Sequence, residues 1–374
     1  MKLAIATEQQ ELRDAVRRFL ADRAPLSRVR ELMQTPDGID RAVWQQAGAQ
    51  LGLHGIAIPE QYGGAGFSFA EQAIVLEELG AALYGGPYLA SSVLAATALL
   101  SASDEAARSE LLPPIASGQT VATLAVTEDD GSWDPAAVRL TASPAGPGGG
   151  WILDGHKSFV LDGHTADLIL VVAATGSGLS LFGVQAGAAG LNRRVLPTLD
   201  QTRKLARLEF RRVPAARLIG APGEAGAILA RTLDVAAIAL AAEQLGGAQR
   251  ALDMAVGYAK TRYQFGRPIG SFQAIKHRCA DLLLEVSSLR SAVRYAAAAV
   301  AEDSAEIPVV AAMTKAYASD VYFHVAAENI QIHGGIGFTW EHDAHLYFKR
   351  AKSSELFLGD ASYHRERLAQ RIGL

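Results

Sequence analysis

The sequence has one cysteine, Cys279, among 374 residues. A single cysteine excludes a disulfide within the chain and fits a reducing compartment. Cys/His spacings of the zinc-binding type are also missing, so no metal site is predicted. Glu8 and Glu11 come before any apolar segment that could serve as a signal peptide. The chain is therefore expected in the cytoplasm.

Neither sign of charge is in large excess: the sequence has 35 Lys and Arg and 39 Asp and Glu, which gives a net charge of −4. This balance argues against a nucleic acid or an anionic membrane as partner. The uncharged run 79–103 is interrupted by Gly85-Gly86-Pro87, and the remainder is shorter than the ~18 residues a membrane span needs. The length predicts two or three globular domains.

Residues 1–120 have helical patterns. Thr7–Gln10 and Ser68–Glu71 are capping boxes that predict helix starts. An amphipathic segment around Trp44 is expected to end at Gly52, and Pro113-Pro114 to end the last helix. The prediction for this part is an N-terminal helical domain.

The pattern changes at Val121, where short β-branched and apolar runs begin. The predicted strands are Val121–Val126, Val138–Ala142, Trp151–Asp154, Leu168–Ala173, Ser180–Val184 and Ala206–Phe210. Their spacing predicts a small antiparallel β-barrel or sandwich over residues 121–222.

Helical periodicity returns in residues 223–374, which are rich in alanine. The long segments Glu224–Thr261, Ser271–Glu302 and Ile307–Ile332, with a broken pair across Glu341–Ile372, predict a four-helix bundle. The expected fold class is α+β: helical domain, β domain, helical bundle.

Phe265-Gly266-Arg267-Pro268 must interrupt the path between the first two long helices, because proline disfavours helix in the residue before it. Arg262, Arg267 and Phe265 would then form an anion-binding corner. The alternative is a helical hairpin whose arginines simply face water.

The stretch from Arg262 to Gln273, Arg-x-x-Phe-Gly-x-Pro-Ile-x-x-Phe-Gln, closely resembles a motif of the acyl-CoA dehydrogenase family. Gln331-Ile332-His333-Gly334-Gly335-Ile336-Gly337-Phe338 resembles a second motif of that family, in the expected order. The resemblance runs along nearly the whole chain and includes the helix, barrel, helix layout. It extends to the small subunits of heteromeric bacterial members.

The resemblance implies removal of a proton and a hydride from adjacent carbons of an acyl-CoA thioester. FAD would accept the hydride, a carboxylate would act as base, and an electron-transfer flavoprotein would receive the electrons. Fatty acids or sterol side chains would be degraded in this way. Because FAD contacts are shared across subunits in this family, a homo-oligomer or a hetero-oligomer with a homologous subunit is expected.

The resemblance also assigns cofactor-binding residues. Thr127 and Phe159 would contact the flavin ring from the β domain. Residues of a neighbouring subunit would bind the pyrophosphate and adenine side: Arg262, Phe265, Gln273, Gln331, Gly334 and Gly335.

Four positions depart from the family pattern. Leu358 occupies the usual base position, and Ala236 occupies the position of the base in a minority of members. Leu161 replaces a threonine that donates to the flavin, and Trp133 replaces a serine near CoA.

Two carboxylates are candidates for a relocated base. Glu243 lies two turns beyond Ala236 amid apolar neighbours, where burial would raise its pKa. Its alternative is a buried glutamate paired with an arginine. Asp360 is the second candidate, and its alternative is the N-cap of a helix over 361–372.

Three functions follow. The first is an FAD-dependent acyl-CoA dehydrogenase with a relocated base. The second is a partner subunit that completes FAD sites in a heteromer without performing chemistry, which the changes at Leu161, Trp133 and Leu358 favour. The third is a nitroalkane-oxidase-like flavin reaction with Asp360 as base.

Overall fold

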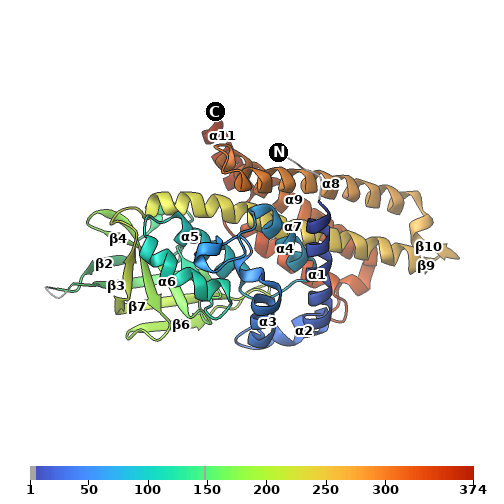
Figure 1. Cartoon of the computed structure of the whole chain (residues 1–374). Helices are drawn as coiled ribbons and strands as arrows, with labels where there is room; N and C mark the ends of the chain where they lie inside the picture. The colour runs from blue at the N-terminus through green and yellow to red at the C-terminus, as the bar shows by residue number, and fades with distance from the viewer. Residues whose placement is uncertain (1–5, 147–148) are drawn as a thin grey trace. The chain divides into compact units, whose positions relative to one another are not determined.

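The computed structural model describes residues 6–146 and 149–374 (Figure 1). Helices come first, strands follow, and long helices complete the chain. The predicted fold class, α+β with this order of elements, is confirmed. The chain forms two compact units. Unit 1 comprises residues 1–30, 69–84 and 237–374, and unit 2 comprises residues 31–68 and 85–236.

The described part of the N-terminal third, from residue 6 onward, contains six α-helices and a buried π-helical segment, Leu89–Ala95. The α-helices are α1 (Thr7–Arg23), α2 (Leu26–Leu32), α3 (Arg41–Leu51), α4 (Phe69–Ala81), α5 (Ala96–Ser101) and α6 (Glu105–Ala116). As predicted, α3 ends at Gly52, whose φ of 63° is the left-handed conformation that glycine tolerates.

Two predicted helix boundaries are wrong. The N-cap of α1 is Ala6 and not Thr7, because the Gln9 side chain, rather than Gln10, accepts a hydrogen bond from the Ala6 N–H at 3.1 Å. Pro113 and Pro114 lie inside α6 instead of ending it. The fixed φ of proline is compatible with a helix. Because proline has no backbone N–H, each of the two prolines costs one backbone hydrogen bond, and the helix tolerates this loss near its C-terminal end.

The β elements of unit 2 form one eight-stranded sheet. The strands are β1 (Ala122–Ala125), β2 (Thr141–Pro144), β3 (Trp151–Leu161), β4 (Leu168–Thr175), β5 (Gly178–Gln185), β6 (Leu191–Val195), β7 (Leu205–Ala215) and β8 (Arg217–Ile219). Their order is β6-β7-β3-β2-β4-β5-β8, and β1 pairs with β4. The sheet is mixed rather than purely antiparallel, because β1 and β2 each pair with β4 in parallel.

The C-terminal helices are long and largely buried on one side. They are α7 (Ala225–Thr261), α8 (Gln273–Ala301), α9 (Ile307–His333), α10 (Ala344–Leu356) and α11 (Ala361–Ile372). A two-stranded hairpin, β9 (Tyr263–Gln264) and β10 (Arg267–Pro268), separates α7 from α8. The predicted interruption is therefore confirmed.

Within unit 1, α4 and α7 pack backbone to backbone. A Cβ built on Gly80 would lie 1.9 Å from the Glu243 carbonyl oxygen, and one on Gly246 would lie 1.7 Å from the Glu77 carbonyl oxygen. Only glycine allows this approach. The packing fixes the part of α7 that carries Glu243.

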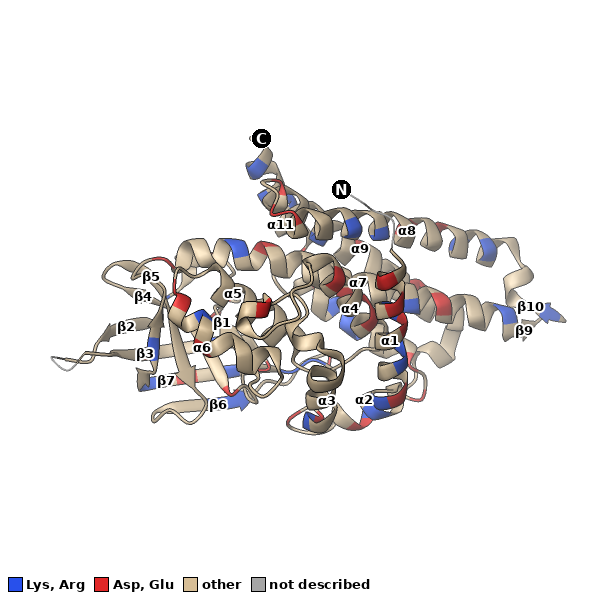
Figure 2. Cartoon of the chain, in the orientation of Figure 1, with Lys and Arg blue, Asp and Glu red and all other residues tan. Residues whose placement is uncertain are grey.

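Charged residues of both signs occur on α1 and α4 (Figure 2), and their side chains connect these two helices of unit 1. Arg13 of α1 donates to Glu77 at 2.8 Å and to Glu78 at 3.0 Å, and all three side chains are buried. Arg17 donates to Glu78 as well, at 3.0 Å. These ion pairs tie the first helix of the chain to α4.

Among the described residues, α7 alone is long and apolar enough to cross a membrane. Its apolar window is 78% buried inside the protein, as in a core helix. The apolar run considered in the sequence, 79–103, contains the end of α4, the π-helical segment and α5.

Candidate functional site

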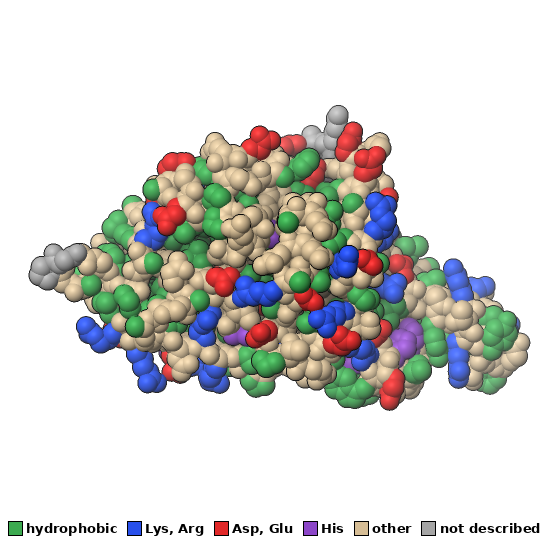
Figure 3. Space-filling model, turned by 60° about the horizontal axis from the view of Figure 1, so that its bottom comes forward, with side chains coloured by type: hydrophobic (Ala, Val, Ile, Leu, Met, Phe, Trp, Pro, Cys, Tyr) green, Lys and Arg blue, Asp and Glu red, His purple; other side chains and the backbone are tan. Residues whose placement is uncertain are grey.

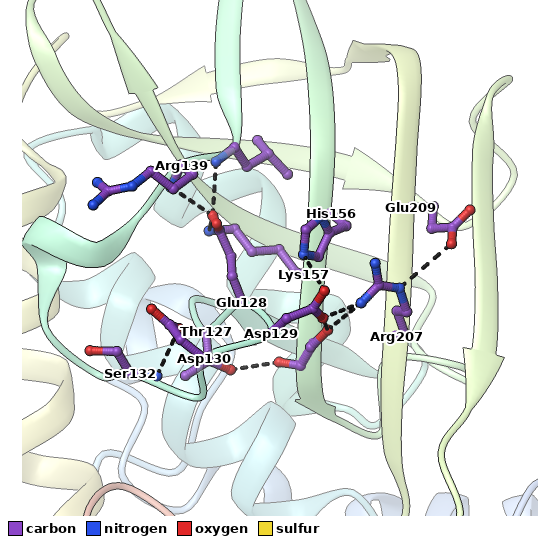
Figure 4. A network of polar contacts seen from close by, with 12 residues as sticks. Thr127, Glu128, Asp129, Asp130, Ser132, Arg139, His156, Lys157, Arg207 and Glu209 are labelled. Carbon is purple, nitrogen blue, oxygen red and sulfur yellow. Dashed lines mark hydrogen bonds and ion pairs between the residues drawn. The ribbon is translucent and has the colours of Figure 1, made fainter.

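The first group of predicted site residues lies in unit 2, where the end of β1 meets a bulge in β3 (Figure 4). The register of β3 against β7 shifts between Lys157 and Val160, so Ser158 and Phe159 leave the ladder. Phe159 has a φ of 58° and an exposed fraction of 39%. The bulge thus presents an aromatic side chain at the surface of unit 2.

Thr127 is held against this bulge. Its hydroxyl donates to the Ser158 carbonyl at 2.6 Å, and its own carbonyl accepts from the Ser158 N–H at 2.9 Å. The Thr127 side chain is buried, and its oxygen keeps the capacity to accept one more hydrogen bond.

Lys157 and Glu128 form a buried ion pair at the same place, with an Nζ–Oε1 distance of 3.0 Å. Burial lowers the pKa of Lys157 to about 8, although Glu128 partly offsets this. Burial acts to raise the pKa of Glu128, but the N–H groups of Leu140 and Arg139 together with Lys157 lower it by more. Both groups are therefore charged near neutral pH. This pair was not predicted from the sequence, where its signal is a lysine within the mainly apolar strand β3.

The second group lies in unit 1, at the hairpin between α7 and α8. Phe265 and Gly266 form the turn with φ values of 52° and 72°, typical of a two-residue hairpin. Phe265 is 91% exposed, and Arg262 and Gln273 are exposed too. Arg267 lies over the Phe272 ring at 4.1 Å. Figure 3 shows hydrophobic and basic side chains gathered at the right, where Figure 1 places this hairpin.

The end of α9 packs against the base of this hairpin. Tyr258 of α7 stacks on His333 at 4.2 Å between ring centroids. Ile332 belongs to one apolar cluster with Ala255 and Ala259, against which Ile269 also packs. The structure thus brings together the two sequence motifs of unit 1, residues 262–273 and residues 331–338. Within the second motif, Gln331, Gly334 and Gly335 are exposed.

Glu243 is buried on α7, and its carboxylate forms an ion pair with Arg350. The Arg350 guanidinium of α10 donates to Glu243 Oε1 at 2.9 Å, and only 2% of Arg350 is exposed. The pairing with an arginine, the alternative predicted for Glu243, is what the structure contains. Its role as a base stays a prediction.

Asp360 is the N-cap of α11 and accepts a hydrogen bond from the Tyr363 N–H at 2.8 Å. The helix-cap alternative predicted for Asp360 is confirmed. A cap oxygen bonded to its own helix is poorly placed to take a proton from a substrate.

Leu358, at the predicted base position, is buried in a turn between α10 and α11. Its φ is 64°. The His364 Nε2–H donates to the Leu358 carbonyl at 3.0 Å, and Lys315 donates to the Gly359 carbonyl at 3.1 Å. Burial and the nearby Lys315 lower the pKa of His364 to about 3, so the ring is neutral. These hydrogen bonds fix the backbone of the turn, and the side chain at its centre, Leu358, is apolar and buried.

Known proteins resemble this arrangement over its whole length. The acyl-CoA dehydrogenase N-terminal domain matches residues 6–119, the middle domain 123–213 and the C-terminal domain 226–373. The acyl-CoA dehydrogenase IpdE2 of Mycobacterium tuberculosis (strain ATCC 25618 / H37Rv) is 38% identical over 351 residues, which cover 94% of this chain and 93% of the relative. The chain belongs to the acyl-CoA dehydrogenase family.

Two solved structures are also similar to this acyl-CoA dehydrogenase family member. One is the electron transferring flavoprotein of Acidaminococcus fermentans, with 31% identity, a TM-score of 0.93, and 100% of both chains covered. The other is the ChsE4-ChsE5 complex of Mycobacterium tuberculosis, with 32% identity, a TM-score of 0.90, and 100% of this chain and 99% of that chain covered. The predicted family is confirmed by these comparisons, and FAD is the cofactor of the family.

The residues of this acyl-CoA dehydrogenase family member fit FAD. Arg262 offers an exposed guanidinium for a diphosphate. A Cβ built on Gly334 or Gly335 would meet nothing within 4 Å, so their backbone is open to a ligand. Phe159 offers an exposed aromatic face. The individual contacts remain predictions.

Arg262→Ala is expected to weaken FAD binding by about tenfold to a hundredfold, the value of a charge-assisted hydrogen bond. FAD titration would measure this, while the helical circular dichroism should stay unchanged. Lys260→Ala, an exposed cation on the last turn of α7, is the matched control. Equal FAD affinity in the two variants would contradict the role of Arg262.

Proposed function

We propose that the chain is the FAD-binding subunit of a heteromeric acyl-CoA dehydrogenase, and that a homologous partner subunit supplies the catalytic base. The assembly desaturates an acyl-CoA thioester between its α and β carbons and passes the electrons to an electron-transfer flavoprotein. The observation that carries this proposal is the engagement of both candidate carboxylates. Glu243 is paired with Arg350, and Asp360 caps α11.

A base must reach the proton on the α carbon with a carboxylate oxygen that is able to accept it. Leu358 cannot do so, and the turn that holds it is fixed by Lys315 and His364. Moving Glu243 to a substrate would break a buried ion pair, which costs several kcal/mol. A base on another subunit avoids that cost. The similarity to a chain of the ChsE4-ChsE5 complex supports a heteromer.

This chain would contribute the cofactor side of the site. Bound FAD supplies a hydride acceptor. Thr127 and Phe159 would orient the flavin ring from unit 2. The exposed Arg262 and the open backbone at Gly334 and Gly335 would bind the diphosphate of an FAD whose flavin ring lies in a neighbouring subunit. The thioester carbonyl must be polarised by donors near the flavin, because the α proton is otherwise too weakly acidic.

The test is anaerobic reduction of the bound flavin by acyl-CoA, followed by absorbance. The chain alone is expected to leave its flavin oxidised. The complex with a homologous chain encoded by a neighbouring gene should reduce it, and Glu243→Gln in the complex should keep at least half of the rate. Replacing the partner's carboxylate should abolish the reduction.

The second candidate function is desaturation by this chain alone with Glu243 as base. The observation in its favour is the position of Glu243, which is only 7% exposed and lies on α7 two turns beyond Ala236. Flavin reduction by the isolated chain, lost in Glu243→Gln while FAD stays bound, would establish this candidate and overturn the heteromeric one.

A further inference from the structure

Phe159 has a backbone conformation that its own strand does not maintain. A φ of 58° is unfavourable for a residue with a bulky side chain. Ser158 and Phe159 lie in the bulge and are not paired with β7. Contacts outside the β3–β7 ladder must therefore keep the bulge in place.

One set of such contacts comes from a fully buried ammonium group. Lys157 Nζ donates to the Val126 carbonyl at 2.8 Å and to Glu128 Oε1 at 3.0 Å. Val126 and Glu128 flank Thr127 in the sequence. A single side chain, next to the bulge, therefore contacts both neighbours of Thr127: the backbone of Val126 and the side chain of Glu128. Figure 4 shows the contact with Glu128.

Glu128 in turn is fixed by the backbone. Its Oε1 accepts from the N–H groups of Arg139 and Leu140, both at 2.8 Å. The carboxylate thus receives three hydrogen bonds, and the ammonium has a charged and a neutral acceptor. Charges satisfied in this way are held in one geometry, because any displacement leaves a buried charge without its partners.

A second set of contacts holds the bulge from its outer side. Ser158 Oγ donates to Asp129 Oδ1 at 2.5 Å, and Arg207 of β7 pairs with the same carboxylate. His156 Nε2 lies 3.0 Å from Asp129 Oδ2. A hydrogen bond therefore also connects Asp129, which follows Glu128, with Ser158, which follows Lys157.

Replacing a buried ion pair by apolar residues of similar volume is often neutral or stabilising. On stability grounds, two apolar side chains could therefore stand in place of Lys157 and Glu128. The two residues of the pair are neighbours in the sequence of the residues predicted to contact the flavin: Glu128 follows Thr127, and Lys157 precedes the bulge that contains Phe159. The pair is therefore placed to orient Thr127 and Phe159.

We propose that Lys157 and Glu128 are positioning residues for the flavin. Their buried ion pair clamps the end of β1 to the β3 bulge, and so fixes the Thr127 hydroxyl and the Phe159 ring in the arrangement that receives the isoalloxazine ring. This inference rests on the proposed FAD-binding function. Lys157 acts through Thr127 and Phe159, because it is itself fully buried.

Lys157→Met and Glu128→Gln test the proposal in the assembly that binds FAD. Methionine keeps most of the length of the lysine side chain without the ammonium, and glutamine keeps an acceptor for Arg139 and Leu140 without the charge. Each variant is expected to raise the FAD dissociation constant at least tenfold and to shift the visible absorption band of the bound flavin. Amide hydrogen exchange at Ser158 and Phe159 in the FAD-free protein should accelerate at least tenfold.

Lys204→Met is the matched control. Lys204 is a part-buried lysine of the same unit. Its Nζ donates to the Met33 carbonyl at 2.8 Å, and Met33 belongs neither to β1 nor to the bulge of β3. It should leave the flavin spectrum and the exchange at Ser158 unchanged, whatever its effect on stability.

The outcomes separate the two proposals. If the wild type takes up FAD and both variants keep its affinity and spectrum, the positioning role is overturned and the proposed function stands. If the wild type takes up no FAD, alone or with its partner, the proposed function is overturned and the positioning of the flavin with it. Unchanged exchange at Ser158 and Phe159 in both variants would also overturn the clamp.

Discussion

Arg350→Met is expected to lower the free energy of unfolding by about 3–5 kcal/mol. Arg350 and Glu243 are both buried, with an Nη1–Oε1 distance of 2.9 Å. Removing the guanidinium would leave a buried carboxylate without this cation. Removing both charges, in Arg350→Met with Glu243→Leu, should recover most of the loss, because no buried charge then remains at the pair. Denaturant unfolding followed by the helical signal measures both variants.

Lys352→Met is the control on the same helix. Lys352 pairs with Glu355 at 3.0 Å, but its side chain is 39% exposed, and exposed pairs contribute about 0–1 kcal/mol. An Arg350→Met variant no less stable than Lys352→Met would mean that the Glu243–Arg350 pair does not hold the structure. The carboxylate would then be available for chemistry, and the second candidate function would gain support.

Acidification from pH 7.5 to pH 5 is expected to destabilise the protein through two buried histidines. The His54 ring stacks on Trp44 at 3.6 Å, and its Nε2 lies 2.7 Å from the Trp44 carbonyl oxygen. Burial lowers the pKa of His54 to about 4, and that of His364 to about 3. In the unfolded state histidine has a pKa of about 6.5, so at pH 5 it binds a proton, whereas the folded histidines stay largely neutral at that pH.

The sign follows from that difference. The stability associated with each neutral histidine is fully present above pH 6.5 and is lost as the pH falls toward the folded pKa. At pH 5 the loss is about 2 kcal/mol for each histidine, or about 4 kcal/mol for both. Unfolding curves at several pH values measure it.

His54→Phe keeps the ring stack with Trp44 and removes the titrating group. Its free energy of unfolding should vary less between pH 6.5 and pH 5 than that of the wild type, by about 2 kcal/mol. Parallel pH profiles of the variant and the wild type would contradict the assignment to His54.

Much of the fold could be predicted because local signals agree with long-range packing. The α7–α8 break contains proline and glycine, and α3 ends at a glycine with positive φ. The strand β6 was missed for a physical reason. It is an edge strand with mostly exposed residues, Leu-Asn-Arg-Arg-Val, and so lacks the apolar alternation that marks a strand. The parallel partners of β1 and β2 depend on long-range pairing, which a local pattern does not specify.

The site was predictable only where a motif carries it. The Arg262 and Gly334 motifs are continuous in sequence, and the structure joins them through Tyr258 and His333. The partner of Glu243 is 107 residues away, in a charged segment that resembles a solvated helix face. The apolar neighbours of Glu243 indicated burial correctly, but they could not distinguish a base from half of an ion pair.

Unit 1 has an unusual order of assembly along the chain. It combines residues 1–30 and 69–84 with residues 237–374, whereas unit 2 is complete by residue 236. During synthesis the apolar faces of α1 and α4 therefore emerge long before the helices of unit 1 that cover them. The buried contacts of Arg13 with Glu77 and Glu78 give these two early helices a pairing of their own in the meantime. Segments far apart in the sequence thus form one compact unit, and residues up to the C-terminal helices must be synthesised before that unit can close.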